Sequence, residues 1–198
     1  MKKIIKCTIF LVLVVALFDL WQDRQVLKEN IIRLHVVANS DSAMDQEVKL
    51  QVKDEIVRYL QPIINQFPSK QQAMEYIRDN LDVLQELSND VLIRLGVKEK
   101  ASASLQLEKF DTRIYDTFSL PAGSYDALRI EIGEAEGKNW WCVVFPSLCL
   151  PATSSDFQET AITSGFSQSL SNTLSHNRSY RVRFFLLDCI GRLENVFF

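Results

Sequence analysis

The sequence predicts an α+β fold, a single domain in which two N-terminal helices pack on a mostly antiparallel sheet. Residues 44–95 carry apolar side chains about every four positions, which is typical of helices with one buried side. Five short stretches instead alternate apolar and polar residues, which is typical of half-buried strands. These stretches are 31–38, 102–107, 127–132, 140–145 and 180–184. The predicted order of elements is therefore β-α-α-β-β-β-(α)-β.

The helix ends are marked by capping residues. The first helix is predicted over 44–64, and the second begins after Pro68 and runs to Gly96, which suits the position just past a helix end. Each helix starts at a serine followed three residues later by a side chain that completes a capping box. The two pairs are Ser42 with Asp45 and Ser69 with Gln72.

The second half of the chain is predicted to contain mainly strands. Pro121-Ala122-Gly123 marks a turn, and Gly133 to Gly137 is predicted to join the strands 127–132 and 140–145 as a hairpin. Residues 152–179 are rich in Ser, Thr and Asn, so they are predicted as a mobile segment with a short helix near 157–174. The strand 180–184 and an apolar tail end the domain, which is predicted to span 28–198.

The N-terminal segment has the pattern of an export signal. Lys2, Lys3 and Lys6 precede an apolar run from Cys7 to Phe18. A dozen apolar residues behind basic ones are typical of a signal peptide, whereas about 20 are needed to span a bilayer. Residues 1–21 are therefore predicted to be a signal peptide or a short signal anchor, with the only small-residue cleavage candidate at Val14-Val15-Ala16.

The charge of the chain limits its partners. The formal net charge is −3 in 198 residues. A mildly acidic protein has no electrostatic reason to bind nucleic acid or anionic lipid. Membrane contact is therefore expected only through the N-terminal segment.

The stretch GKNWWCVVFPSLCLP holds two cysteines, for which three interpretations stay open. Cys142 and Cys149 enclose six residues including Pro146, and in an oxidising compartment such a pair favours a disulfide. Two inert buried thiols are the second interpretation. A nucleophile or a metal ligand is the third, although C-x6-C lacks the tight spacing of a zinc site. Cys189 is expected to remain unpaired as a small apolar residue.

No motif gives strong support for catalysis. Residues 39–45 contain two carboxylates but lack the spacing of a calcium loop, so helix capping is the favoured reading. Residues 165–169 lack the second glycine of a nucleophile elbow. His35 is expected on the polar face of its strand, where it could pair with Cys142 or Cys149. The prediction is a protein without a cofactor or a metal and not an enzyme, with an exported Cys/His hydrolase as the alternative.

The adjacent Trp140 and Trp141 suggest a contact surface. Successive side chains of a strand point to opposite faces, so a sheet with one buried face would leave one of these rings outside. Tryptophan is enriched in binding hot spots, which favours an interaction domain. A second packed layer that hides both rings is the other reading.

Two blocks of the sequence resemble stage II sporulation protein R of endospore-forming bacteria. The first is Ile32-Arg33-Leu34-His35-Val36-Val37-Ala38-Asn39-Ser40-Asp41-Ser42, followed by Asp45-Gln46 and by residues 50–54. The second starts at 121–125 and runs through 127–133 and 137–143 to 145–149. Together they cover about 31–150. Ser147 replaces an expected second proline, and residues 152–179 match nothing in the family.

The resemblance implies a developmental signal made in the forespore. Proteins of this family are exported into the space between forespore and mother cell, where they activate a membrane aspartic protease, stage II sporulation protein GA. That protease then processes the sigma-E precursor. A structural, membrane-anchored sporulation component is a further alternative. Candidate partner-contact residues within the two blocks are Arg33, His35, Asn39, Asp41, Asn139, Trp140 and Trp141.

Overall fold

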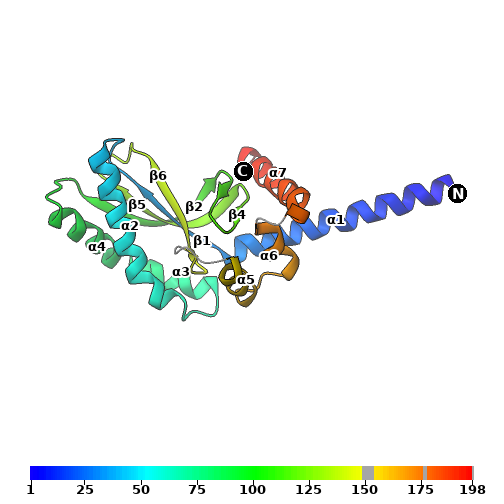
Figure 1. Cartoon of the computed structure of the whole chain (residues 1–198), viewed down its shortest axis with the longest axis horizontal. Coiled ribbons are helices and arrows are strands. Elements are labelled where there is room, and N and C mark those ends of the chain that lie inside the picture. The colour runs from blue at the N-terminus through cyan, green and yellow to red at the C-terminus, as the bar shows by residue number, and fades with distance from the viewer. Residues whose placement is uncertain (149–153, 176–177, 198) are drawn as a thin grey trace.

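The structure is a computed structural model that describes residues 1–148, 154–175 and 178–197. It is an α+β domain from which one long N-terminal helix projects (Figure 1). Its helices are α1 (Lys2–Asn30), α2 (Ala43–Ile64), α3 (Lys70–Asp79), α4 (Leu81–Arg94), α5 (Ser154–Thr163), α6 (Gln168–Leu174) and α7 (Arg181–Phe197), with a 3-10 turn at Arg178–Tyr180. Its strands are β1 (Ile32–Val37), β2 (Ala101–Phe110), β3 (Arg113–Ile114), β4 (Ser119–Leu120), β5 (Gly123–Ile132) and β6 (Asn139–Phe145).

The main sheet confirms the predicted fold class but corrects one connection. Its strand order is β2-β5-β1-β6, with β1 parallel to β5 and both other neighbouring pairs antiparallel. Because β1 lies between β5 and β6, Gly133 to Gly137 is not the turn of a hairpin. This loop passes over the end of β1, where the N–H of Gly137 donates to the carbonyl of Ala38 at 2.9 Å. Local alternation predicts strands but not which strand inserts between them.

Helices α2, α3 and α4 cover one face of the sheet, where alternate β1 residues such as Leu34 and Val36 enter the larger core. Both predicted N-caps are confirmed, because the hydroxyls of Ser42 and Ser69 accept from the N–H groups three residues ahead. The predicted second helix is wrong in one respect, since it breaks at Asn80. The Asn80 amide donates to the carbonyl of Tyr76, and this local bond competes with the helical ladder.

A second core lies on the opposite face, at the end of the sheet nearest α1 (Figure 1). It contains residues from the last part of α1, from α5 and α6, and from α7. The segment predicted as polar thus places Phe157, Phe166 and Leu170 in a core, although its mobility stays a prediction. The predicted strand 180–184 is wrong, because α7 occupies Arg181–Phe197.

The reason for the last correction is the longer periodicity of α7. Five residues of alternation at 180–184 mimic a strand. Phe184, Leu187 and Gly191, spaced three and four residues apart, instead lie on the packed side of a helix. A β-carbon at Gly191 would lie only 1.7 Å from the carbonyl oxygen of Ala122, so this glycine lets α7 cross the preceding turn.

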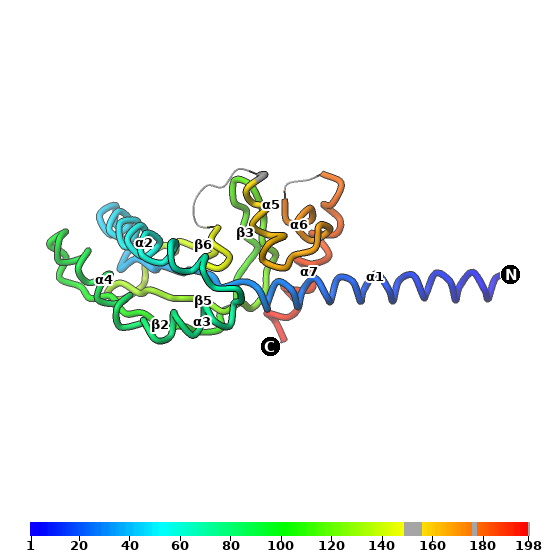
Figure 2. The backbone as a smooth tube through the Cα atoms, turned by 90° about the horizontal axis from the view of Figure 1, so that it is seen from below, coloured from blue at the N-terminus to red at the C-terminus, as the bar shows by residue number. Residues whose placement is uncertain are grey.

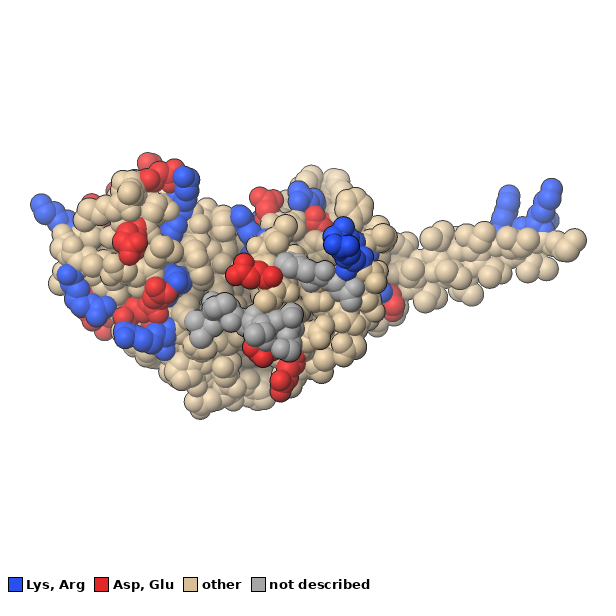
Figure 3. Space-filling view, in the orientation of Figure 1, with Lys and Arg blue, Asp and Glu red and all other residues tan. Residues whose placement is uncertain are grey.

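Helix α1 combines an exposed apolar half with a packed half. Its first half projects from the domain as a rod with Lys side chains only near the tip (Figures 2 and 3). In the part of the chain that the structure describes, α1 is the one helix that is long and apolar enough to cross a membrane. This suits a signal peptide or a membrane anchor. The packed half begins at Leu20, earlier than the predicted domain start at 28, and includes Arg24 and Leu27.

Candidate functional site

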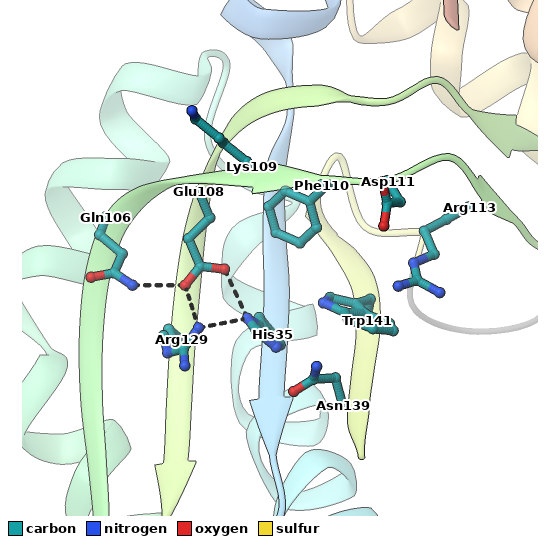
Figure 4. Close-up of a pocket in the computed structure, with 10 residues that line it drawn as sticks. All are labelled: His35, Gln106, Glu108, Lys109, Phe110, Asp111, Arg113, Arg129, Asn139 and Trp141. Carbon is teal, nitrogen blue, oxygen red and sulfur yellow. Dashed lines mark hydrogen bonds and ion pairs between the residues drawn. The ribbon is translucent and has the colours of Figure 1, made fainter. Parts of the chain in front are cut away.

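A hollow of about 330 Å³ lies on the sheet face that carries the second core (Figure 4). It occupies a part of this face that the helices of the second core leave uncovered. Among the described residues its lining comes from strands and from the β2–β3 connection, with no helix residue. The strand register explains the grouping. His35 lies at the centre of the sheet, with Arg129 of β5 as its neighbour on one side and Trp141 of β6 on the other.

Glu108 holds the floor of the hollow together. One of its carboxylate oxygens accepts from His35 Nδ1 at 2.8 Å, and the other accepts from Arg129 at 3.0 Å and from Gln106 at 2.7 Å. Burial raises the pKa of Glu108, but these hydrogen bonds outweigh burial and lower the pKa to about 2. Glu108 is therefore ionised at neutral pH. Arg129 also donates to Glu131 at 2.8 Å, which completes an ion network.

The network fixes the orientation of His35. A carboxylate only accepts hydrogen bonds, so the 2.8 Å contact with Glu108 places the proton on His35 Nδ1, and the 3.2 Å contact of that nitrogen with Arg129 is then no hydrogen bond. The His35 ring is 7% exposed and stacks on Trp141 with 5.5 Å between the ring centroids. Its other nitrogen, Nε2, is buried and has no hydrogen-bond partner among the described residues.

Arg113 of β3 lies on the far side of Trp141. Its guanidinium carbon is 3.4 Å from the centroid of a Trp141 ring, which is a cation–π contact. Burial and then the neighbouring charge of Arg33 lower the pKa of Arg113. Within the described part of the chain no carboxylate forms an ion pair with Arg113. Trp141 is thus packed between an imidazole and an unpaired guanidinium (Figure 4).

Arg33 is one of the candidate partner-contact residues, but the structure places its side chain completely out of contact with solvent. Its guanidinium lies 3.9 Å from the ring centroid of Phe110 and donates to the hydroxyl of Tyr115 at 3.0 Å. The alternating pattern of the strand puts Arg33 on the polar face. It does not show that aromatic rings cover this face and bury the side chain. Its Nε and Nη1 have no hydrogen-bond partner among the described residues.

The other predicted contact residues fall into two groups. Asn139 lies at the rim of the hollow with His35 and Trp141. Trp140 lies on the opposite face of β6, against the larger core and 5.0 Å from the ammonium of Lys53.

Asn39 and Asp41 hold the loop between β5 and β6. The Asn39 side-chain oxygen accepts from the N–H of Glu134 at 3.0 Å. Asp41 accepts from the N–H of Lys138 at 2.7 Å. These two residues therefore position the chain that leads into β6 and do not line the hollow.

Sequence reasoning missed Glu108, Arg113 and Arg129. The alternation over 127–132 places Arg129 on one face of its strand, but only the sheet order shows that this is also the face of His35. Arg113 belongs to a two-residue strand, which is too short for a periodic signal. No local pattern could have identified it.

Where the structure describes the cysteines, they do not form the Cys/His pair of the alternative hydrolase hypothesis. Cys142 is opposite Leu34 in the register and lies in the larger core, on the other side of the sheet from His35. Cys149 lies outside the described residues, so its disulfide with Cys142 stays a prediction. Cys189 is free, as is Cys7. The described residues contain no cluster of three or more His, Cys, Asp or Glu side chains suited to a metal ion.

Comparison with known proteins gives one consistent result. A family model described as stage II sporulation protein R matches residues 28–155. Stage II sporulation protein R of Bacillus subtilis (strain 168) is 32% identical over 158 residues, which cover 75% of this chain and 70% of that protein. No solved structure matches the chain. The matched range contains the whole sheet and every residue of the hollow, and the chain therefore belongs to the stage II sporulation protein R family.

Proposed function

We propose that this protein is an exported signal of endospore formation that activates stage II sporulation protein GA, a membrane aspartic protease of the mother cell. Activation leads to processing of the sigma-E precursor. Family membership supports the role in sporulation. The apolar first half of α1 supports export, followed either by release into the space between forespore and mother cell or by retention as an anchor.

The observation that carries a binding role is the construction of the hollow. One of its two acids, Glu108, is saturated by hydrogen bonds from three neighbours, and the Trp141 ring and the Arg113 guanidinium lie beside it. Among the described residues its lining includes no hydroxyl or thiol that could act as a nucleophile. Trp and Arg are the residue types most enriched in binding hot spots. The arrangement suits recognition of a partner.

A binding protein activates a protease by preferring one of its states. If the hollow binds the assembled or open state more tightly than the resting state, binding shifts the protease toward the active form. The shift cannot exceed the difference between the two binding free energies. The lining side chains His35, Glu108 and Arg129 already hydrogen-bond to one another, which suits this task because less ordering is needed when the partner docks.

The test is co-expression of this chain with stage II sporulation protein GA and the sigma-E precursor in a bacterium that does not sporulate. The expected result is processing of the precursor only when all three proteins are present. A chain with Glu86→Gln should drive processing as the wild-type chain does, because Glu86 is exposed on α4, on the opposite side of the sheet from the hollow. Absence of processing, with all three proteins present and correctly located, would contradict the proposal.

The continuous α1 helix also favours a second candidate, a structural membrane-anchored component. The two candidates differ in the fate of residues 1–19. Intact-mass measurement of the exported protein tests the second candidate, because loss of the apolar segment would exclude a structural anchor.

A further inference from the structure

The arginine side chains in and beside the hollow are not all paired with carboxylates. Arg113 and Arg129 line it, and Arg33 lies buried beside it. Glu108 and Glu131 are both engaged by Arg129, and Glu108 also accepts from His35. Asp111 lines the same hollow and attracts Arg113 through its charge, but the two side chains form no direct ion pair in the described structure. Two guanidinium groups are therefore left without a carboxylate partner in a protein whose net charge is −3.

The two unpaired guanidinium groups lie against aromatic rings. The guanidinium carbon of half-buried Arg113 is 3.4 Å from a Trp141 ring centroid, and Arg113 Nε is buried without a hydrogen-bond partner among the described residues. Arg33 is fully buried, and two of its nitrogens, Nε and Nη1, also have no hydrogen-bond partner among the described residues. Leaving charged donors buried and unpaired is unfavourable unless a ligand supplies the missing acceptors. The position of Arg113 is thus prepared for an anion that arrives from outside.

The geometry selects the kind of anion. A guanidinium presents parallel N–H groups that match the two oxygens of a carboxylate. Glu108 and Asp111, which both line the hollow, repel a dianion such as phosphate more strongly than a singly charged group. The Trp141 ring lies against a face of the Arg113 guanidinium, and a carboxylate would bind at the N–H edge of the same group.

We propose that the hollow receives the carboxylate of an Asp or Glu side chain of the protein partner, which pairs with the guanidinium of Arg113 beside Trp141. The identity of the partner as a protein rests on the proposed function. The binding of a carboxylate does not, because it follows from the unpaired guanidinium groups and the stacked Trp141.

The test uses a small probe with the full-length chain in detergent micelles. N-acetyl-Gly-Glu-Gly-amide is titrated against protein labelled with ¹⁵N, and the Arg113 Nε–H and Trp141 indole signals are followed by NMR. A single ion pair with one stacked ring is expected to give a Kd on the order of 1 mM. The same peptide with Gln in place of Glu should leave both signals unshifted, as should inorganic phosphate at the same concentration.

Three variants make the test specific to Arg113. Arg113→Gln should weaken binding of the Glu peptide at least about tenfold, whereas Asp111→Asn should strengthen it because a repelling carboxylate is removed. Arg58→Gln, which removes an exposed cation on α2, should leave binding unchanged. Circular dichroism verifies that each variant is folded. Equal shifts with the Glu and Gln peptides, tighter binding of phosphate, or unchanged binding by folded Arg113→Gln protein would overturn the proposal.

Processing of the sigma-E precursor separates this proposal from the function on which it rests. If the Glu peptide binds and Arg113→Gln abolishes binding, but the wild-type chain yields no processing, the carboxylate site stands and the proposed function fails. If the wild-type chain and Arg113→Gln drive processing equally and the Glu peptide does not bind, the function stands and the carboxylate site fails.

Discussion

Trp140 and Trp141 are neighbours in the chain, yet their rings contact opposite faces of the sheet. Trp140 packs against the larger core beneath α2, whereas Trp141 stacks on His35 in the hollow. The sequence suggested either one exposed ring or a layer that hides both. Both rings are half-buried, and each packs against a different core.

Substituting the two tryptophans should therefore have different consequences. Trp140→Ala should lower the free energy of unfolding by about 2 kcal/mol, because it removes part of the core under α2. Trp141→Ala should cost only about 1 kcal/mol for the lost stack but should abolish processing of the sigma-E precursor. Urea unfolding and the co-expression assay measure the two effects. If Trp140→Ala is stable but does not activate processing, and Trp141→Ala does activate it, then Trp140 and not Trp141 would be the ring that contacts the partner.

Glu108 should make the stability of the domain depend on pH in the acid range. The pKa of Glu108 falls from 4.5 to about 2 in the folded state, so its stabilising contribution is fully present above pH 4.5. That contribution, up to about 3 kcal/mol, should be lost as the pH falls toward 2, because the unfolded chain binds the proton first.

The difference between wild type and Glu108→Gln isolates this effect from that of other acids. Urea unfolding of both proteins at pH 6 and at pH 2.5 should show a large difference at pH 6 and a small one at pH 2.5. Glu86→Gln, on an exposed part of α4, should show no such pattern. A constant difference between wild type and Glu108→Gln at both pH values would mean that Glu108 is not held ionised by His35 and Arg129.

The sequence was sufficient for the elements that depend on local chemistry. The capping pairs at Ser42 and Ser69 and the strand at β1 follow from spacing within a few residues. The position of β1 between β5 and β6 depends on long-range pairing, which no local pattern encodes. The site could be predicted only in part for the same reason. His35, Asn139 and Trp141 were identified, but Glu108, Arg113 and Arg129 join them only through the sheet order.

Helix α7 holds α1 to the domain through Glu194. Its carboxylate accepts from Arg24 at 2.8 and 3.1 Å and also pairs with Lys28, while the remaining Arg24 nitrogen donates to the Tyr125 hydroxyl at 2.9 Å. Glu194→Gln should lower the free energy of unfolding by about 3 kcal/mol, because Arg24, with 2% of its side chain exposed, would keep its charge without a counter-ion.

An ion pair in solvent provides the control for Glu194. Glu55 pairs with Arg58 and Arg94, whose side chains are largely exposed. Glu55→Gln should have a much smaller effect than Glu194→Gln, since water screens the exposed cations. Urea unfolding of the two variants compares them directly. Equal effects would show that the buried position of Arg24 does not matter.

Truncation tests where the folded domain begins. A chain that starts at Leu20 keeps Arg24 and Leu27 and should melt within a few degrees of the full-length protein. A chain that starts at Ile31 loses two buried leucines, each contributing about 2 kcal/mol, and leaves Glu194 without its main partner. It should melt at a clearly lower temperature, with faster amide hydrogen exchange in α7. Equal melting temperatures for the two truncated chains would exclude α1 from the domain. If the chain that starts at Leu20 is as stable as expected, cleavage at Val14-Val15-Ala16 releases an intact domain. The cleaved protein and the membrane-anchored protein would then present the same hollow to a partner.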